Sequence, residues 1–213
     1  MRRLLAALVL AVPCAAAAAP SLESAAAGSL SSFATAALPS PSARLVAAAR
    51  RPMAATIDGA FSGQTASLAI DRRAWTVTGA LAGREVKVAI DNAASTITGG
   101  ANGAAVDLTF AWTPERVAYK GAANQSSVDY AIDWTNGVLD GTANGSPVHI
   151  EFSLANGTVD SDKSYANGWP VTLTYDPVSG KLAGALGGRN VALTMVNADL
   201  SDFLQNLYLF LQP

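Results

Sequence analysis

The chain has 213 residues, of which 50% are hydrophobic, 14% charged and 7% aromatic, and its formal net charge is −2. This length supports one domain with a real hydrophobic core, and a mildly acidic chain without a basic run is a poor candidate for binding nucleic acid. After Val12 no apolar stretch reaches the roughly 20 residues that a membrane-spanning helix needs.

The first 19 residues have the three parts of a secretory signal peptide. Arg2 and Arg3 form a positive start, a short apolar segment follows, and a run of alanines offers small-residue cleavage sites. We expect cleavage after Ala17 or Ala18. Two alternatives stay open, a retained membrane anchor and lipidation at Cys14.

Cys14 is the only cysteine and lies within the predicted signal peptide. The mature chain would therefore have no disulfide, no thiol nucleophile and no thiolate metal site. Removal of the two arginines with the signal peptide changes the formal net charge from −2 to −4.

Residues 20–54 are rich in Ala and Ser and carry a weak helical pattern of apolar residues. Ser42 can cap a short helix over residues 43–51, which Pro52 would end. The alternative is a disordered linker. The apolar residues near helical spacing are Leu22, Ala26, Leu30, Phe33 and Ala37.

Residues 55–197 repeat one unit seven times, and each copy has the alternation of a β-hairpin. The first apolar residue after each turn recurs at separations of 20, 20, 22, 20, 23 and 20 residues. A repeat of this regularity predicts an antiparallel array of hairpins with about 14 strands. The recurring positions are Ala66, Val86, Val106, Val128, Val148, Val171 and Val191.

Turn pairs such as Asn102-Gly103 favour two-residue type I′ turns, in which both residues have positive φ. This turn type fixes the register, because positions equidistant from the turn face each other. It predicts the pairs Gly99–Val106, Ile97–Leu108, Gly121–Val128, Tyr119–Tyr130, Gly141–Val148 and Leu139–Ile150 on an apolar face, and Lys120–Asp129, Thr98–Asp107 and Thr78–Lys87 on a polar face.

A glycine recurs on the apolar face of most copies, although Gly weakens a strand interior. Either the sheet bends sharply there, or a helix or an aromatic ring packs closely over the row. The glycines are Gly59, Gly79, Gly99, Gly121, Gly141 and Gly184.

Residues 198–213 predict an amphipathic helix that docks on the apolar face of the hairpins, with Asp199 as its N-cap. The alternative is a final strand over residues 207–211. The apolar stripe consists of Leu200, Phe203, Leu204, Leu207 and Leu211. The predicted fold class is therefore all-β: a curled antiparallel up-and-down meander, barrel-like or sandwich-like, with short terminal helices.

His149 is the only histidine, and the register places it opposite Asp140 and next but one to Glu151 on the polar face. The sixth repeat, with the extra residues VDSDKSYANGW, adds Asp160 and Asp162, and places Asp162 opposite Leu173 unless a bulge intervenes. These five polar residues form a weak candidate site; the alternative is a solvated surface. Other aspartates recur at strand ends with the repeat, which favours turn capping over catalysis; they are Asp71, Asp91, Asp133 and Asp176.

Three of the four tryptophans fall at the end of the meander opposite the tight turns. Trp75, Trp112 and Trp134, with Arg73 and Arg116, suit a carbohydrate or another amphipathic ligand. The alternative is that each Trp covers the open end of the core.

The sequence predicts an exported, non-enzymatic protein of the bacterial cell envelope, periplasmic or extracellular, with a structural or ligand-binding role. It predicts no catalytic residues, no metal site and no cofactor, because the motifs of hydrolases, zinc enzymes and nucleotide binding are missing. Membrane association is not favoured. The first alternative is an outer-membrane β-barrel, and the second is a hydrolase that uses two carboxylates.

Overall fold

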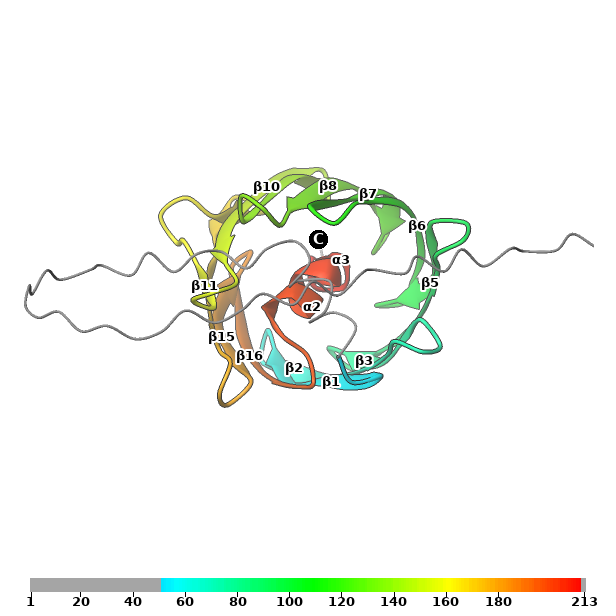
Figure 1. Cartoon of the computed structure of the whole chain (residues 1–213), viewed down its shortest axis with the longest axis horizontal. Helices are drawn as coiled ribbons and strands as arrows, with labels where there is room; N and C mark the ends of the chain where they lie inside the picture. The colour runs from blue at the N-terminus through cyan, green and yellow to red at the C-terminus, as the bar shows by residue number, and fades with distance from the viewer. Residues whose placement is uncertain (1–50, 212–213) are drawn as a thin grey trace, which may run out of the picture. The chain divides into compact units, whose positions relative to one another are not determined.

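The computed structural model describes residues 51–211. The predicted signal peptide and nearly all of the Ala/Ser-rich segment lie outside the described residues. Within them the chain forms an antiparallel sheet that closes into a barrel around two short helices (Figure 1). The all-β meander of hairpins and the position of the C-terminal helices on its apolar face are confirmed.

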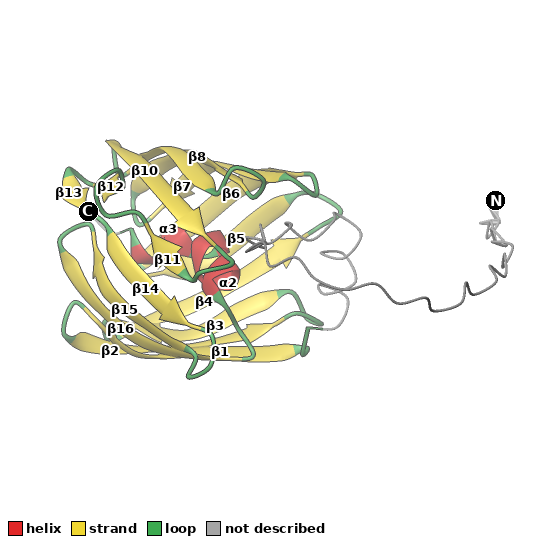
Figure 2. Cartoon of the chain, turned by 60° about the vertical axis from the view of Figure 1, so that its left-hand side comes forward, coloured by secondary structure: helices red, strands yellow, loops and turns green. Residues whose placement is uncertain are grey.

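The described residues contain sixteen strands in one sheet. Figure 2 shows them from the side, wrapped around the helices. The strands are β1 (Ala54–Phe61), β2 (Gln64–Asp71), β3 (Thr76–Leu81), β4 (Arg84–Asp91), β5 (Thr96–Ala101), β6 (Ala104–Trp112), β7 (Arg116–Ala123), β8 (Ser126–Asp133), β9 (Val138–Ala143), β10 (Ser146–Ser153), β11 (Thr158–Val159), β12 (Tyr165–Ala166), β13 (Trp169–Pro170), β14 (Thr172–Asp176), β15 (Lys181–Leu186) and β16 (Arg189–Val196).

Two seams close the barrel. At the first, β1 pairs with β16, for example Ile57 with Met195. At the second, the short strand β11 bridges β10 and β14, and it uses Thr158 to pair with both. The small hairpin β12–β13 pairs with β10 beside the ring, so fourteen of the sixteen described strands make up the barrel wall, as the sequence predicts.

The seven tight turns have the geometry that the sequence predicts. Both turn residues have positive φ in every copy, including the less regular pair Asn124-Gln125 at 55° and 63°. All the predicted cross-strand pairs occur, from Gly99 opposite Val106 to Lys120 opposite Asp129. The register of the hairpins is therefore confirmed.

The recurrent glycines mark a backbone distortion. Their φ values lie between 139° and 147°, and a Cβ built on Gly99 would overlap the carbonyl oxygen of Lys87 on the adjacent strand. The atoms that crowd this row belong to the backbone of the neighbouring strands, so a covering helix or aromatic ring is the wrong explanation. Five of the six glycines are also exposed, because the backbone departs from the regular pleat there.

The predicted register of the sixth hairpin is wrong between β11 and β14. Leu173 is buried and faces Gly184 of β15, whereas Asp162 lies exposed in the loop between β11 and β12. An unpaired carboxylate on the apolar face would be costly. The strand breaks instead, and its central part becomes the separate hairpin β12–β13.

Two helices fill the barrel, α2 (Leu200–Gln205) and α3 (Leu207–Phe210), and they replace the single helix of the prediction. Asp199 caps α2 as predicted, within a capping box that Asp202 completes. Every residue from Leu200 to Leu211 except Gln205 is buried. Aromatic contacts join the helices to the wall, with ring centroids 5.3 Å apart for Phe61 and Phe210.

An ionic anchor holds the start of α2. Arg51 lies 2.7 Å from the Asp199 carboxylate and 3.2 Å from that of Asp202, which also lies 3.0 Å from Arg72. Burial raises the pKa of the Asp202 carboxyl, the charge of Asp199 raises it further, and the two arginines oppose this shift.

Two turn asparagines hold the other end of the helices. Asn124 donates its side-chain amide to the carbonyl oxygens of Tyr208 and Leu211 at 2.9 and 3.0 Å. Asn102 donates to Leu209 at 3.0 Å and to the Asn124 side chain at 2.7 Å. These bonds satisfy carbonyl groups that the end of a helix leaves unpaired.

The outer wall is polar and finely alternating. On β4, for example, Val86 and Val88 are buried while Glu85 and Lys87 are exposed. The apolar faces of the hairpins therefore point inward, toward the helices. None of the helices in the described part of the chain is long and apolar enough to span a membrane.

Replacement of Gly99 by Ala should destabilise the barrel more than the same change at Gly103. Both positions have positive φ, but a Cβ at Gly103 meets no atom within 4 Å. We expect Gly99→Ala to lower the free energy of unfolding by about 3 kcal/mol and Gly103→Ala by about 1 kcal/mol. Urea unfolding followed by Trp fluorescence measures both, and equal losses would contradict the overlap with the neighbouring strand.

Asn124→Ala should cost more stability than Asn144→Ala. Both residues occupy the first position of a type I′ turn, at φ 55° and 57°, but the buried side-chain amide of Asn144 has no hydrogen-bond partner. Loss of the bonds to α3 should lower the free energy of unfolding by about 2 kcal/mol beyond the effect at Asn144. The same urea measurement tests this, and a larger loss at Asn144 would contradict the capping role.

Candidate functional site

The predicted polar residues meet on the outer wall where β10 changes partner. One half of β10 pairs with β12 and the other half with β11. We define the polar cluster as Asp140, His149, Glu151, Asp160 and Lys163. The first three stand on the neighbouring strands β9 and β10, and the other two lie in the loop after β11.

His149 lies between two carboxylates. Its Nδ1 is 2.9 Å from Asp140 and its Nε2 is 3.7 Å from Glu151. The ring of Tyr165 stacks on the imidazole with centroids 5.7 Å apart. Since both ring nitrogens face a carboxylate, neither is placed to activate a nucleophile.

Lys163 links Glu151 to Asp160, the third carboxylate of the cluster. Its ammonium lies 2.9 Å from Glu151 and 3.6 Å from Asp160. The hydrogen bond and the charge of Glu151, followed by the charge of Asp160, raise the pKa of the Lys163 amine. The lysine is therefore a cation at neutral pH, and it compensates part of the negative charge of the cluster.

Asp162 enters the cluster only through its backbone. Its amide donates to Asp160 at 3.1 Å, and its side chain is exposed. The alternative of a solvated surface therefore describes the Asp162 side chain.

Three members of this region were missed by the sequence analysis. They are Lys163, Tyr165 and Ser164, whose buried hydroxyl accepts the Glu151 amide at 2.9 Å. All three belong to the extra segment of the sixth repeat. The sequence shows that this repeat is longer than the others. It does not show that the extra segment pairs with β10, because that pairing forms only where the barrel closes.

A groove of about 400 Å³ adjoins the polar cluster. Glu151 and Asp160 contribute to both, so the cluster forms one end of the groove. Ser153, Thr158 and Asn136 add hydroxyl and amide groups. The groove thus combines carboxylates with neutral hydrogen-bonding groups on a rigid wall.

The three tryptophans of the predicted edge differ in exposure and stand on different hairpins. Trp75 and Trp112 are 49% and 61% exposed, whereas Trp134 is half-buried and packs edge-on against Phe152 at 5.9 Å. No ring contact joins the three tryptophans within residues 51–211. Trp134 therefore covers the open end of the core, and the other two stand on separate hairpins.

The two arginines of that edge interact with aspartates close to them. Arg116 stands opposite Asp133 and helps to lower its pKa. The backbone amide of Arg73 donates to Asp71 at 2.8 Å. Arg73 lies two residues before Trp75, and Arg116 precedes Val117, the cross-strand partner of Trp112.

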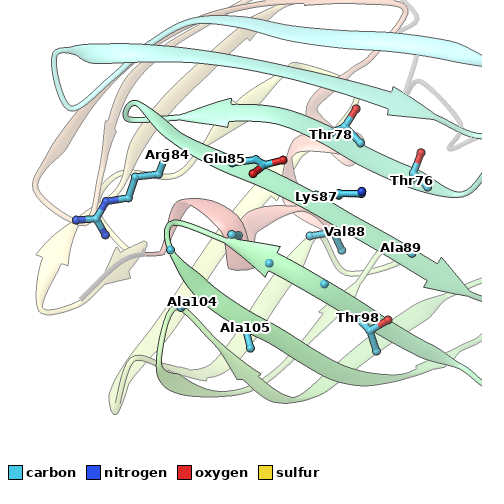
Figure 3. Close-up of a pocket in the computed structure, with 14 residues that line it drawn as sticks. Thr76, Thr78, Arg84, Glu85, Lys87, Val88, Ala89, Thr98, Ala104 and Ala105 are labelled. Atoms are coloured by element: carbon cyan, nitrogen blue, oxygen red, sulfur yellow. The ribbon is translucent and has the colours of Figure 1, made fainter.

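A wider hollow of about 860 Å³ lies on the outer face of β3–β6 (Figure 3). Threonine, alanine and glycine line most of it, with Glu85 and Lys87 on β4. Small side chains on a regular sheet explain its shape. Its charged lining residues are Arg84, Glu85 and Lys87, all on β4.

The aspartates that recur with the repeat are turn caps, as predicted. Asp91 accepts the amides of Ala93 and Ala94, each at 2.9 Å. Bonds of the same kind to backbone amides lie at Asp71, Asp133 and Asp176. Their position in the repeat has a structural cause, and none belongs to the polar cluster.

Among residues 51–211, no group of three or more His, Cys, Asp or Glu side chains is arranged to hold a metal ion. Comparison of the chain with protein-family models, with curated proteins and with solved structures finds no match. Function is therefore inferred from the geometry of the described residues.

The turn caps predict an acid-sensitive contribution to stability. Hydrogen bonds from Asn136 lower the pKa of Asp133, and those from Ser179 and Val178 lower the pKa of Asp176, from an ordinary value of 3.8. A carboxylate whose pKa is lower in the folded state stabilises the fold at pH values above its ordinary pKa. This stabilisation is lost as the pH falls through the lowered, folded-state pKa.

The double variant Asp133→Asn/Asp176→Asn should therefore lose less stability than the wild type between pH 5 and pH 2. Urea unfolding at several pH values measures the loss. Asp107→Asn, on the outer wall, is the control. An unchanged acid loss in the double variant would contradict the capping role.

Proposed function

We propose that the protein is an exported, non-enzymatic β-barrel of the bacterial cell envelope with a structural or ligand-binding role. The observation that carries the proposal is the filled lumen. Soluble barrels that bind small molecules inside need an open cavity, but Phe203, Leu207 and Phe210 occupy the centre here and are at most 1% exposed. A ligand would bind on the outer wall or the loops.

The outer wall favours an aqueous compartment over the alternative of an outer-membrane barrel. A membrane barrel carries an apolar band of about 25 Å on its outer face. The outward positions here include Lys87, Lys120 and Asp129 near the middle of their strands. Charged side chains at such positions are costly in lipid.

The polar cluster does not favour the alternative of a carboxylate hydrolase. A glycosidase keeps one of its two carboxyl groups protonated to act as the general acid. Glu151 and Asp160 instead share the Lys163 ammonium. The hydroxyl of Ser164 bonds to the backbone of Glu151 and not to His149, so the cluster lacks a Ser-His pair.

The full chain, produced with its leader in a Gram-negative host, should be recovered from the periplasm or the medium without detergent. Its gel mobility should not depend on heating in the manner of outer-membrane barrels. Fractionation followed by size-exclusion chromatography in plain buffer measures this. A chain that stays with the outer membrane until detergent is added would contradict the proposal.

A further inference from the structure

We infer that the groove beside the polar cluster binds a neutral carbohydrate; this inference rests on the proposed ligand-binding role and names its ligand class. Three features follow one another along a strip of the outer wall on β10. They are a groove of about 400 Å³, a set of fixed hydrogen-bonding groups, and an exposed aromatic ring in line with them.

The hydrogen-bonding groups match sugar hydroxyls, each of which can donate and accept. Glu151 and Asp160 accept, and bonds to a carboxylate are stronger than neutral ones. Ser153 and Thr158 donate or accept through their hydroxyls, and Lys163 donates. Lys163 is 59% exposed and Asp160 43%, so a ligand can reach both.

The cluster holds these groups in place before any ligand arrives. Lys163 links Glu151 to Asp160 at 2.9 and 3.6 Å, while His149 lies 3.7 Å from the other oxygen of Glu151. The backbone amide of Glu151 is bound by the buried Ser164 hydroxyl at 2.9 Å. Groups fixed in this way lose little conformational freedom on binding.

Tyr165 supplies the apolar surface that a sugar ring needs. It is 41% exposed and rests on the His149 imidazole, with 27° between the ring planes. His149 and Ser153 are four residues apart on β10, roughly 13 Å. The strip from Tyr165 to the groove is therefore long enough for an oligosaccharide.

The charge of the cluster selects against acidic ligands. The three carboxylates of Asp140, Glu151 and Asp160 outnumber Lys163 and His149 together, so the strip has an excess of negative charge. A uronic acid or sulfated sugar would meet like charge near the carboxylates. A neutral sugar avoids this repulsion and still uses the carboxylates as acceptors.

The test is a glycan array probed with the mature protein and calorimetry with neutral trisaccharides (maltotriose, cellotriose, mannotriose) and acidic trigalacturonate. We expect binding of a neutral sugar. The double variant Glu151→Gln/Asp160→Asn and, separately, Tyr165→Ala should weaken it at least about tenfold. The control Asp129→Asn, on the outer wall beside Lys120, should bind as the wild type does, and circular dichroism checks that every variant folds.

Three results would overturn the inference: no neutral glycan bound on the array, binding that the groove variants leave unchanged, or a preference for trigalacturonate. The proposed function fails separately, when the chain fractionates with the outer membrane. If Trp75→Ala or Trp112→Ala abolishes binding and the groove variants do not, the binding role stands and the groove is the wrong site.

Discussion

The filling of the lumen is the constraint on which the rest of this structure depends. A wall of fourteen strands encloses more space than inward side chains can fill, and the C-terminal helices supply the missing volume with residues such as Phe203 and Phe210. Helices inside a barrel bring polar backbone ends into an apolar space. The chain satisfies them with Asp199 and Asp202 at the start of α2 and with Asn102 and Asn124 at the end of α3.

Burial also raises the pKa values of Tyr119 and Tyr208, which stay protonated inside the barrel at neutral pH.

The filled lumen also determines where the wall can vary. Inward side chains pack against α2 and α3, and two of the tight turns bond to the helices through Asn102 and Asn124. The glycine row is committed to the backbone, since a side chain at Gly99 would overlap Lys87. Outward side chains neither pack against the helices nor approach the backbone of a neighbouring strand. The departure of the sixth repeat from the common length therefore costs the core little, because Leu173 and Val159 still point inward.

Sequence reasoning reached the hairpin register, the turn type and the helical C-terminal segment, because each follows from short-range rules. Strand alternation has a period of two, and Asn-Gly pairs demand positive φ at both positions. It failed where a position depends on a distant partner. Asn102 was identified as a turn residue, but its bond to Leu209 depends on where the helix lies in three dimensions. The glycines were placed on the apolar face because the alternation was assumed to continue through them, and the distortion at φ near 143° interrupts it. The polar cluster is predictable only in part. Asp140 and His149 face each other because of hairpin geometry. Lys163 and Tyr165 come close to them only because β12 pairs with β10.

The seam explains why the polar cluster lies where it does. The hairpin strands elsewhere on the wall pair with one neighbouring strand on each side, so outward side chains meet in regular pairs such as Lys120 and Asp129. β10 divides one side between β11 and β12, and the loop between these strands bonds to the backbone of Glu151 at the edge of β10. That loop carries Asp160 and Lys163 to Glu151, and Tyr165 follows it to His149. Three segments of chain meet there, so charged and aromatic groups converge without disturbing the core beneath. The filled barrel therefore presents this convergence of charged and aromatic groups at the seam, and the remaining hairpins hold the seam in register.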